Sequence, residues 1–136
     1  MQEKELKEIM KDLMAKLVQE LQERGSMMER FYIFREGDRK VDDAHVVRAL
    51  SRNFTGSQLA TAYAISLADD MDAIAMIRVR DLSKVVEIEA ENHYEGREYR
   101  TIHISSMLKN EEYQEMSQEY QLNEMNEIHL IGGCLG

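Results

Sequence analysis

Hydrophobic residues recur every three or four positions along the first 24 residues, and charged residues fill the positions between them. This spacing predicts an amphipathic α-helix that ends at Gly25. Its apolar stripe consists of Leu6, Ile9, Met10, Leu13, Met14, Leu17, Val18 and Leu21. Two interpretations remain open: the helix lies on the core of its own domain, or a second copy or a partner shares it. The second interpretation makes five side chains partner-binding, namely Leu6, Met10, Leu13, Leu17 and Leu21.

The next segment, residues 31–35, has the aromatic and β-branched composition of a strand, and a turn follows at Gly37. Tyr32 and Phe34 are expected on opposite faces, which suits a strand that is covered on both sides. The stretch "DDAHVVRALSRN" (42–53) then predicts a short helix capped by its leading aspartates.

A second long helix is predicted from "TGSQLATAYAISLADDM" (55–71), with Ser57 as its N-terminal cap. Apolar residues lie nearly all round this helix, and several of them are alanines. Such a pattern favours a buried helix that a sheet or another helix approaches closely.

Apolar residues alternate with charged residues in two runs, at 77–80 and 86–91, and with Thr101, His103 and Ser105 in a third run at 99–105. The connections at 81–84 and 92–96 are short enough for antiparallel hairpins, which predicts a three-strand meander with one apolar and one charged face. On the charged face, arginines of the first strand would lie opposite glutamates of the second.

The end of the chain predicts one more helix and one more strand. A helix is expected at 110–125, with a thin apolar side and glutamates around the rest. The run "IHLI" (128–131) predicts a last strand that ends at Gly132 and Gly133, which leaves a frayed tail.

The order of these elements predicts the α+β class and one domain that spans residues 1–136. The expected architecture is an antiparallel sheet, with a three-strand meander plus one or two further strands, covered by helices on one face. A long amphipathic helix would stand at its N-terminus.

Net charge is −9, and two thirds of the imbalance falls in the last 26 residues, which hold six glutamates and no basic residue. An acidic chain of this kind is not expected to bind nucleic acid directly. No apolar run approaches the about 18 residues of a membrane span, so no membrane association is expected. A single cysteine, Cys134, and ten methionines suit a reducing compartment, and we expect a cytoplasmic protein.

Candidate chemistry is sparse. None of the four histidines lies three or four residues from another histidine or cysteine, so zinc-type spacing is absent from the sequence. Only a composite site of His103, His129 and Cys134 is conceivable. Ser57 is not in a nucleophile motif. We therefore predict no catalytic residues, no metal, no cofactor and no enzymatic activity.

The leading hypothesis is a non-enzymatic protein-interaction module: an adaptor, chaperone-like protein or regulator that forms homo-oligomers, most simply dimers. Its surfaces would be the N-terminal stripe and the acidic segment with Glu111, Glu112, Glu115 and Glu119. An alternative is an acidic inhibitor or nucleic-acid mimic that blocks a basic enzyme site with these carboxylates. A third hypothesis is a sensor of small anionic ligands, which would use Arg48 and Arg52.

Overall fold

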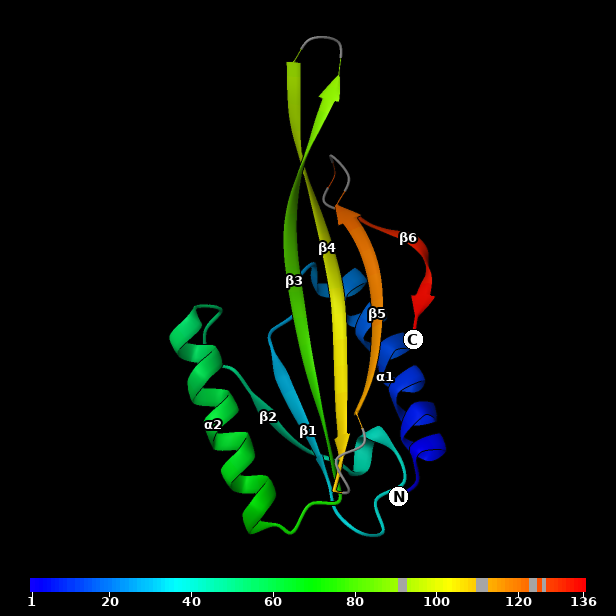
Figure 1. Cartoon of the computed structure of the whole chain (residues 1–136), viewed down its shortest axis with the longest axis vertical. Helices are drawn as coiled ribbons and strands as arrows, with labels where there is room; N and C mark the ends of the chain where they lie inside the picture. The colour runs from blue at the N-terminus through cyan, green and yellow to red at the C-terminus, as the bar shows by residue number, and fades with distance from the viewer. Residues whose placement is uncertain (91–92, 110–112, 123–124, 126) are drawn as a thin grey trace.

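The computed structural model describes residues 1–90, 93–109, 113–122, 125 and 127–136, with side chains for all of them except 83–90 and 93–99. In these ranges the chain forms two α-helices and a six-stranded antiparallel sheet (Figure 1). The α+β class and the long N-terminal helix are thus confirmed. The elements are α1 (Glu3–Arg24), β1 (Arg30–Phe34), β2 (His45–Arg48), α2 (Phe54–Asp70), β3 (Ala75–Ala90), β4 (His93–Leu108), β5 (Tyr113–Leu122) and β6 (Ile128–Leu135).

The strands lie in the order β2-β1-β3-β4-β5-β6. β3 pairs with β4 along its whole length, whereas β1 reaches only to Val79 of β3 and β5 only to Arg100 of β4. Beyond those points the two long strands continue as a two-stranded ribbon, which projects from the rest of the molecule (Figure 1). The edge of β3 is therefore open where β1 begins.

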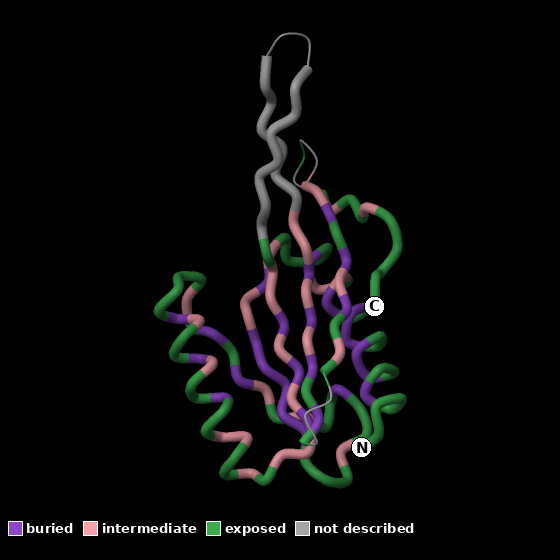
Figure 2. Tube along the Cα trace, in the orientation of Figure 1, coloured by how far each residue is buried: buried purple, intermediate pink, exposed green. Residues whose placement is uncertain are grey.

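Helix α1 packs its apolar stripe on one face of the sheet (Figure 2). The five side chains considered for partner binding, Leu6, Met10, Leu13, Leu17 and Leu21, are each 2% exposed or less. They join a core that includes Ile77, Ile102, Ile104 and Tyr120 from the sheet. Gly25 ends the helix in the left-handed conformation, as predicted. The stripe belongs to the core of its own domain, and the expectation that it forms a partner surface is wrong.

Helix α2 lies on the opposite face, over β1 and β2, so the prediction that both helices cover one face is wrong. Strand β1 supplies the reason, because it is apolar on both sides. Phe31 and Ile33 pack toward α2, whereas Tyr32 and Phe34 pack toward α1. Tyr32 and Phe34 share a face because side chains two residues apart in a strand point the same way.

The start and the burial of α2 also differ from prediction. Asn53, not Ser57, is the cap, and its side-chain oxygen accepts the backbone N–H of Gly56 at 2.7 Å. Only Gly56, Ala60 and Ala64 are buried in this helix. The alanines do let the sheet approach closely, and Leu67 is half-buried beside them, but Leu59, Tyr63 and Ile65 stay exposed.

Residues 42–53 form no α-helix. Asp43 accepts the backbone N–H groups of Arg39 and Lys40 at 2.9 and 3.2 Å, and the first of these bonds is the main reason that the pKa of Asp43 is lowered. The result is a single 3-10 turn, Val41–Asp43. The β-branched Val46 and Val47 then continue as strand β2 against β1.

Two further segments were assigned to the wrong element. Residues 81–84 are not a connection, because β3 runs through them without a break. Residues 113–122 form strand β5, not a helix, and Met116, Gln118 and Tyr120 alternate toward the core. β6 continues past the predicted end because Gly132, at φ +66°, accommodates a shift in register opposite β5.

Tyr120 gives the strongest pH dependence that we expect from this core. Its hydroxyl donates to Asp81 at 2.7 Å, and its pKa is raised well above the ordinary range, first by burial and then by this bond. A tyrosine with a raised folded-state pKa contributes stability that is complete below about pH 10, the unfolded value, and is lost as the pH rises above it.

Tyr120→Phe should therefore lower the free energy of unfolding by about 1.5 kcal/mol at pH 8, the value of a hydrogen bond to a charged acceptor. The difference between the two proteins should shrink toward pH 11, because only the native sequence loses the contribution of this hydroxyl. Denaturant unfolding at both pH values measures it. If the free energies of unfolding of the native sequence and of Tyr120→Phe fell in parallel between pH 8 and 11, this account would be contradicted.

Candidate functional site

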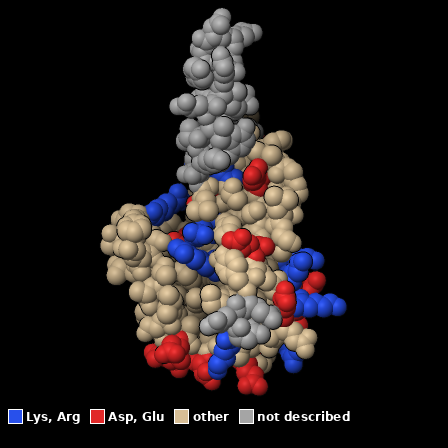
Figure 3. Space-filling view, in the orientation of Figure 1, with Lys and Arg blue, Asp and Glu red and all other residues tan. Residues whose placement is uncertain are grey.

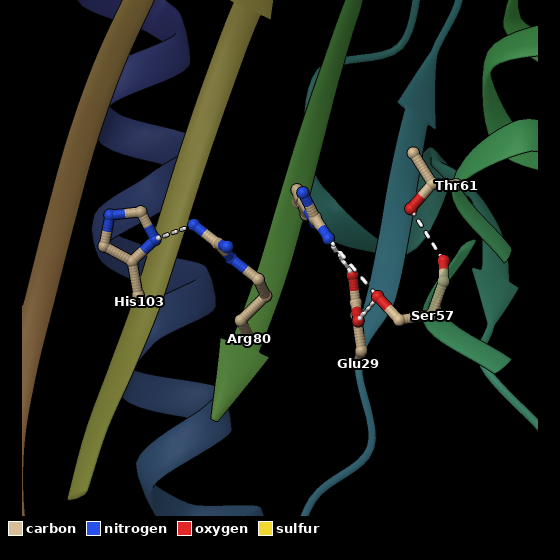
Figure 4. Close-up of polar contacts among 6 residues, drawn as sticks. Glu29, Ser57, Thr61, Arg80 and His103 are labelled. Carbon is tan, nitrogen blue, oxygen red and sulfur yellow. Dashed lines mark hydrogen bonds and ion pairs between the residues drawn. The ribbon is translucent and has the colours of Figure 1, made fainter. Parts of the chain in front are cut away.

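Helix α2 packs on β1 and β2, and a row of polar side chains crosses the same face of the sheet beside it (Figure 4). Arg80 of β3 lies beside His103 of β4, with 3.4 Å between its Nη2 and the histidine Nδ1. His103 Nε2 is 3.4 Å from Glu115 of β5, which also accepts the hydroxyl of Tyr113 at 2.7 Å. His103 thus lies on the polar face, as its alternation predicted.

Glu29 connects this row to α2. It accepts Arg78 Nε at 2.7 Å and the hydroxyl of Ser57 at 2.6 Å, and Thr61 donates to the backbone carbonyl of Ser57 (Figure 4). Arg78 also lies over the ring of Phe31, 5.5 Å from its centre. These contacts fasten the first turns of α2 to the sheet, so the role of Arg78 and Glu29 is structural.

A cleft of about 460 Å³ opens beside this junction, at the free edge of β3. Its walls come from the segment before β1, the first turns of α2, and strands β3 and β4. Four arginines line it, Arg52, Arg78, Arg80 and Arg100, against two carboxylates, Glu29 and Asp81. Figure 3 shows basic side chains gathered on this face between α2 and the ribbon. We call this the arginine cleft.

A second hollow, of about 550 Å³, runs between α2 and the outer edge of β2. Its apolar rim consists of Leu50, Leu59 and Tyr63, which are 98%, 67% and 60% exposed. Residues 54–68 of α2 contain no charged side chain, although 32% of the chain is charged. We call this the β2 groove.

The structure separates the two arginines of the predicted anion site. Arg52 lines the arginine cleft, where its Nε contacts Met28 Sδ at 3.4 Å, whereas Arg48 lines the β2 groove. The prediction assumed one helix face, on which residues four apart are neighbours. Because residues 45–48 form a strand, that spacing does not bring the two side chains together.

The predicted acidic surface is also rearranged. Glu111 and Glu112 fall outside the described residues. Glu115 and Glu119 are exposed on β5, on the polar face, and not on a helix. The hydroxyl of Tyr113, followed by His103, holds the pKa of Glu115 below its usual range. Glu115 therefore already has local partners, unlike a carboxylate that is presented to a foreign surface.

Sequence reasoning missed the residues that build the arginine cleft. The alternation of Arg78 and Arg80 was recognised but assigned to pairs with glutamates of the next strand. The register instead places Ser105 beside Arg78 and His103 beside Arg80, and Glu87 and Glu89 lie on the same strand as the arginines. Only the long-range pairing of β3 with β1 brings these arginines to the start of α2.

Within the described ranges, no group of three or more His, Cys, Asp or Glu residues could hold a metal ion, and His103, His129 and Cys134 do not form one. No helix there is long and apolar enough to cross a membrane. No known protein family matches the chain, and no curated protein or solved structure shows a significant match to it.

Proposed function

We propose that the chain is a non-enzymatic protein-interaction module whose first partner is a second copy of itself, bound along the β2 groove. One observation carries this proposal: Leu50, Leu59 and Tyr63 are largely exposed beside a sheet edge. Large apolar side chains that gather in one place on a surface favour a protein partner over water.

The outer edge of β2 suits a second copy in particular. Within the described sheet, β2 pairs only with β1, so the N–H and C=O groups of its other side are available. Two antiparallel copies of His45–Arg48 are self-complementary about a twofold axis at Val47, because Val47 of one copy then falls opposite Val47 of the other, on the face that carries α2. Such pairing would extend the sheet across both subunits and bring the two α2 helices close to each other.

Charge also favours a second copy. The chain carries a net charge of −9, which opposes self-association at most of its surface. Residues 54–68 are uncharged, so two α2 helices approach without that repulsion. The same uncharged surface offers nothing to a strongly basic or acidic partner. The acidic inhibitor has less support, because Glu115 is engaged by Tyr113 and His103.

Leu59→Glu is expected to weaken self-association by about tenfold or more, because it puts a carboxylate in the apolar rim. The free energy of unfolding of a single copy should hardly change, since Leu59 is exposed there. Sedimentation equilibrium over a range of concentrations measures the association constant.

The matched control is Ala15→Glu, which also puts a carboxylate on an exposed apolar residue of a helix, but on α1 and away from the groove and from residues 54–68. It should associate as the native sequence does. A native protein that stays monomeric at high micromolar concentration would overturn the proposal. An equal effect of both substitutions would also overturn it.

A further inference from the structure

We propose that the arginine cleft binds a small phosphate monoester that carries a flat apolar group, with the phosphate held by Arg52 and Arg80 at the start of α2. This inference does not depend on self-association, because the arginine cleft and the β2 groove have different walls apart from Ser51 and Asn53.

The first argument is the local charge. Four arginines and two carboxylates line the cleft, which leaves an excess of two positive charges in a chain of net charge −9. A concave site with an excess of one sign of charge attracts ligands of the opposite sign. Arginine is the side chain best suited to phosphate, because its planar fork donates two parallel N–H groups to two oxygens.

The second argument concerns which arginines are already engaged. Arg78 is bound by Glu29 at 2.7 Å, and Arg100 lies 3.9 Å from Asp81. Arg52 and Arg80 form no ion pair with any carboxylate of the described residues: Arg52 contacts a methionine sulfur, and Arg80 contacts His103 at 3.4 Å. The excess charge of the cleft therefore resides on these two side chains.

Arg80 gives the most specific sign of a ligand. Its Nε is buried and has no hydrogen-bond acceptor. A buried N–H without a partner costs about 1–3 kcal/mol, so native structures rarely keep one without a reason. The guanidinium has one hydrogen-bond contact, the long one to His103, and its charge also helps to lower the pKa of Glu115. An oxyanion in the cleft would offer it a shorter, charge-assisted acceptor.

The start of α2 adds a third set of donors. Asn53, Phe54 and Ser57 all line the cleft, and the first turn of the helix contains no acidic residue. The first backbone N–H groups of a helix have no acceptor within the helix, and the helix dipole favours an anion at this end. They reinforce the arginines without being the basis of the site.

The apolar group of the ligand is inferred from the rim. The Phe54 ring is largely exposed next to Leu82 and the arginines, and such a ring offers a face on which a flat group stacks. A cavity of about 460 Å³ falls within the usual range for small-molecule sites, about 300–1,000 Å³. The cleft thus matches the phosphate and its apolar substituent together.

The test is calorimetric titration of the full chain with three probes: inorganic phosphate, phenyl phosphate and adenosine monophosphate. Phenyl phosphate and adenosine monophosphate are expected to bind, and more tightly than inorganic phosphate. Arg52→Gln and Arg80→Gln should each weaken phenyl phosphate binding about tenfold, the loss of one charge-assisted hydrogen-bonded contact. Phe54→Ala should weaken phenyl phosphate but leave inorganic phosphate unchanged.

Arg35→Gln is the matched control, because Arg35 is exposed and lies outside the cleft. It should bind phenyl phosphate as the native protein does, and so should Leu59→Glu, which separates this test from that of self-association. Absence of binding by all three probes at millimolar concentration would overturn the proposal. So would an equal loss in Arg35→Gln, because the interaction would then be non-specific attraction to charge.

Discussion

Leu13→Glu should unfold the protein, whereas Ala15→Glu, two residues further along α1, should leave it folded. Leu13 lies on the side of α1 that is buried against the sheet, and Ala15 is exposed on the opposite side of the same helix. Truncating a buried leucine alone costs about 2–5 kcal/mol, and an unpaired carboxylate in an apolar core costs more. Domains of this size are stable by only about 5–15 kcal/mol in total.

Circular dichroism and thermal unfolding of the two variants measure the effect, and Ala15→Glu controls for the added charge. The same substitution distinguishes the two interpretations of the apolar stripe. A core position gives an unfolded or severely destabilised chain, as we expect here. A folded monomer of Leu13→Glu would show that the stripe is an intermolecular seam, contrary to the structure.

Glu20→Ala should lower the free energy of unfolding by about 3 kcal/mol. Glu20 of α1 binds Arg30 of β1, with 2.8 Å between carboxylate Oε2 and guanidinium Nη1. The side chain of Arg30 is 5% exposed, while that of Glu20 is 20% exposed. Removing the carboxylate therefore leaves a buried positive charge without its counter-ion, which is the costly way to break such a pair.

Removal of the other partner of this ion pair is the internal control. Arg30→Met should cost less than Glu20→Ala, because Glu20 is partly solvated and has a second partner in Arg24 at 3.5 Å. Denaturant unfolding of both single variants and of the double variant measures the asymmetry and the coupling. If Glu20→Ala lowered the free energy of unfolding by no more than Arg30→Met does, water would have to reach Arg30, and the pair would not be buried.

Sequence periodicity predicted the elements whose burial is simple. Helix α1 packs on the sheet with one side only, so its apolar residues keep the three- and four-residue spacing that can be recognised in the sequence. The C-terminal end of this helix was also predictable, because Gly25 has a local role that requires no tertiary contact. The alternation around Ile77 and Val79 likewise identified the first part of β3 and its core face.

Periodicity failed where a polar residue occupies a core position. Gln118 is buried on β5 between Met116 and Tyr120, and its amide donates to backbone carbonyls of Glu119 and Gly132. With glutamine in that place, the apolar residues of β5 fall at a spacing that resembles a helix. Asp81 interrupts the apolar alternation of β3 in the same way. The group that satisfies its carboxylate, the Tyr120 hydroxyl, lies 39 residues away in sequence, so the local pattern gives no sign of it.

The candidate sites depend on which residues lie side by side in space, and a single sequence does not give that arrangement. Arg52 was recognised, but Arg80 acquires its significance only beside the start of α2, and that neighbourhood follows from the sheet order. The exposed apolar side chains of α2 were read as core because composition alone does not distinguish an unpartnered apolar surface from a buried one.

The packing of α1 also has a consequence for biosynthesis. Met10 receives a hydrogen bond from Ser106, 96 residues later in the chain, and the rest of the stripe packs on strands β4 and β5. At typical translation rates of about 5–20 residues per second, the helix waits roughly 5–20 seconds for the strands that cover it. Throughout that interval the nascent chain exposes the apolar stripe of α1 to water, because the strands that bury it have not yet been made.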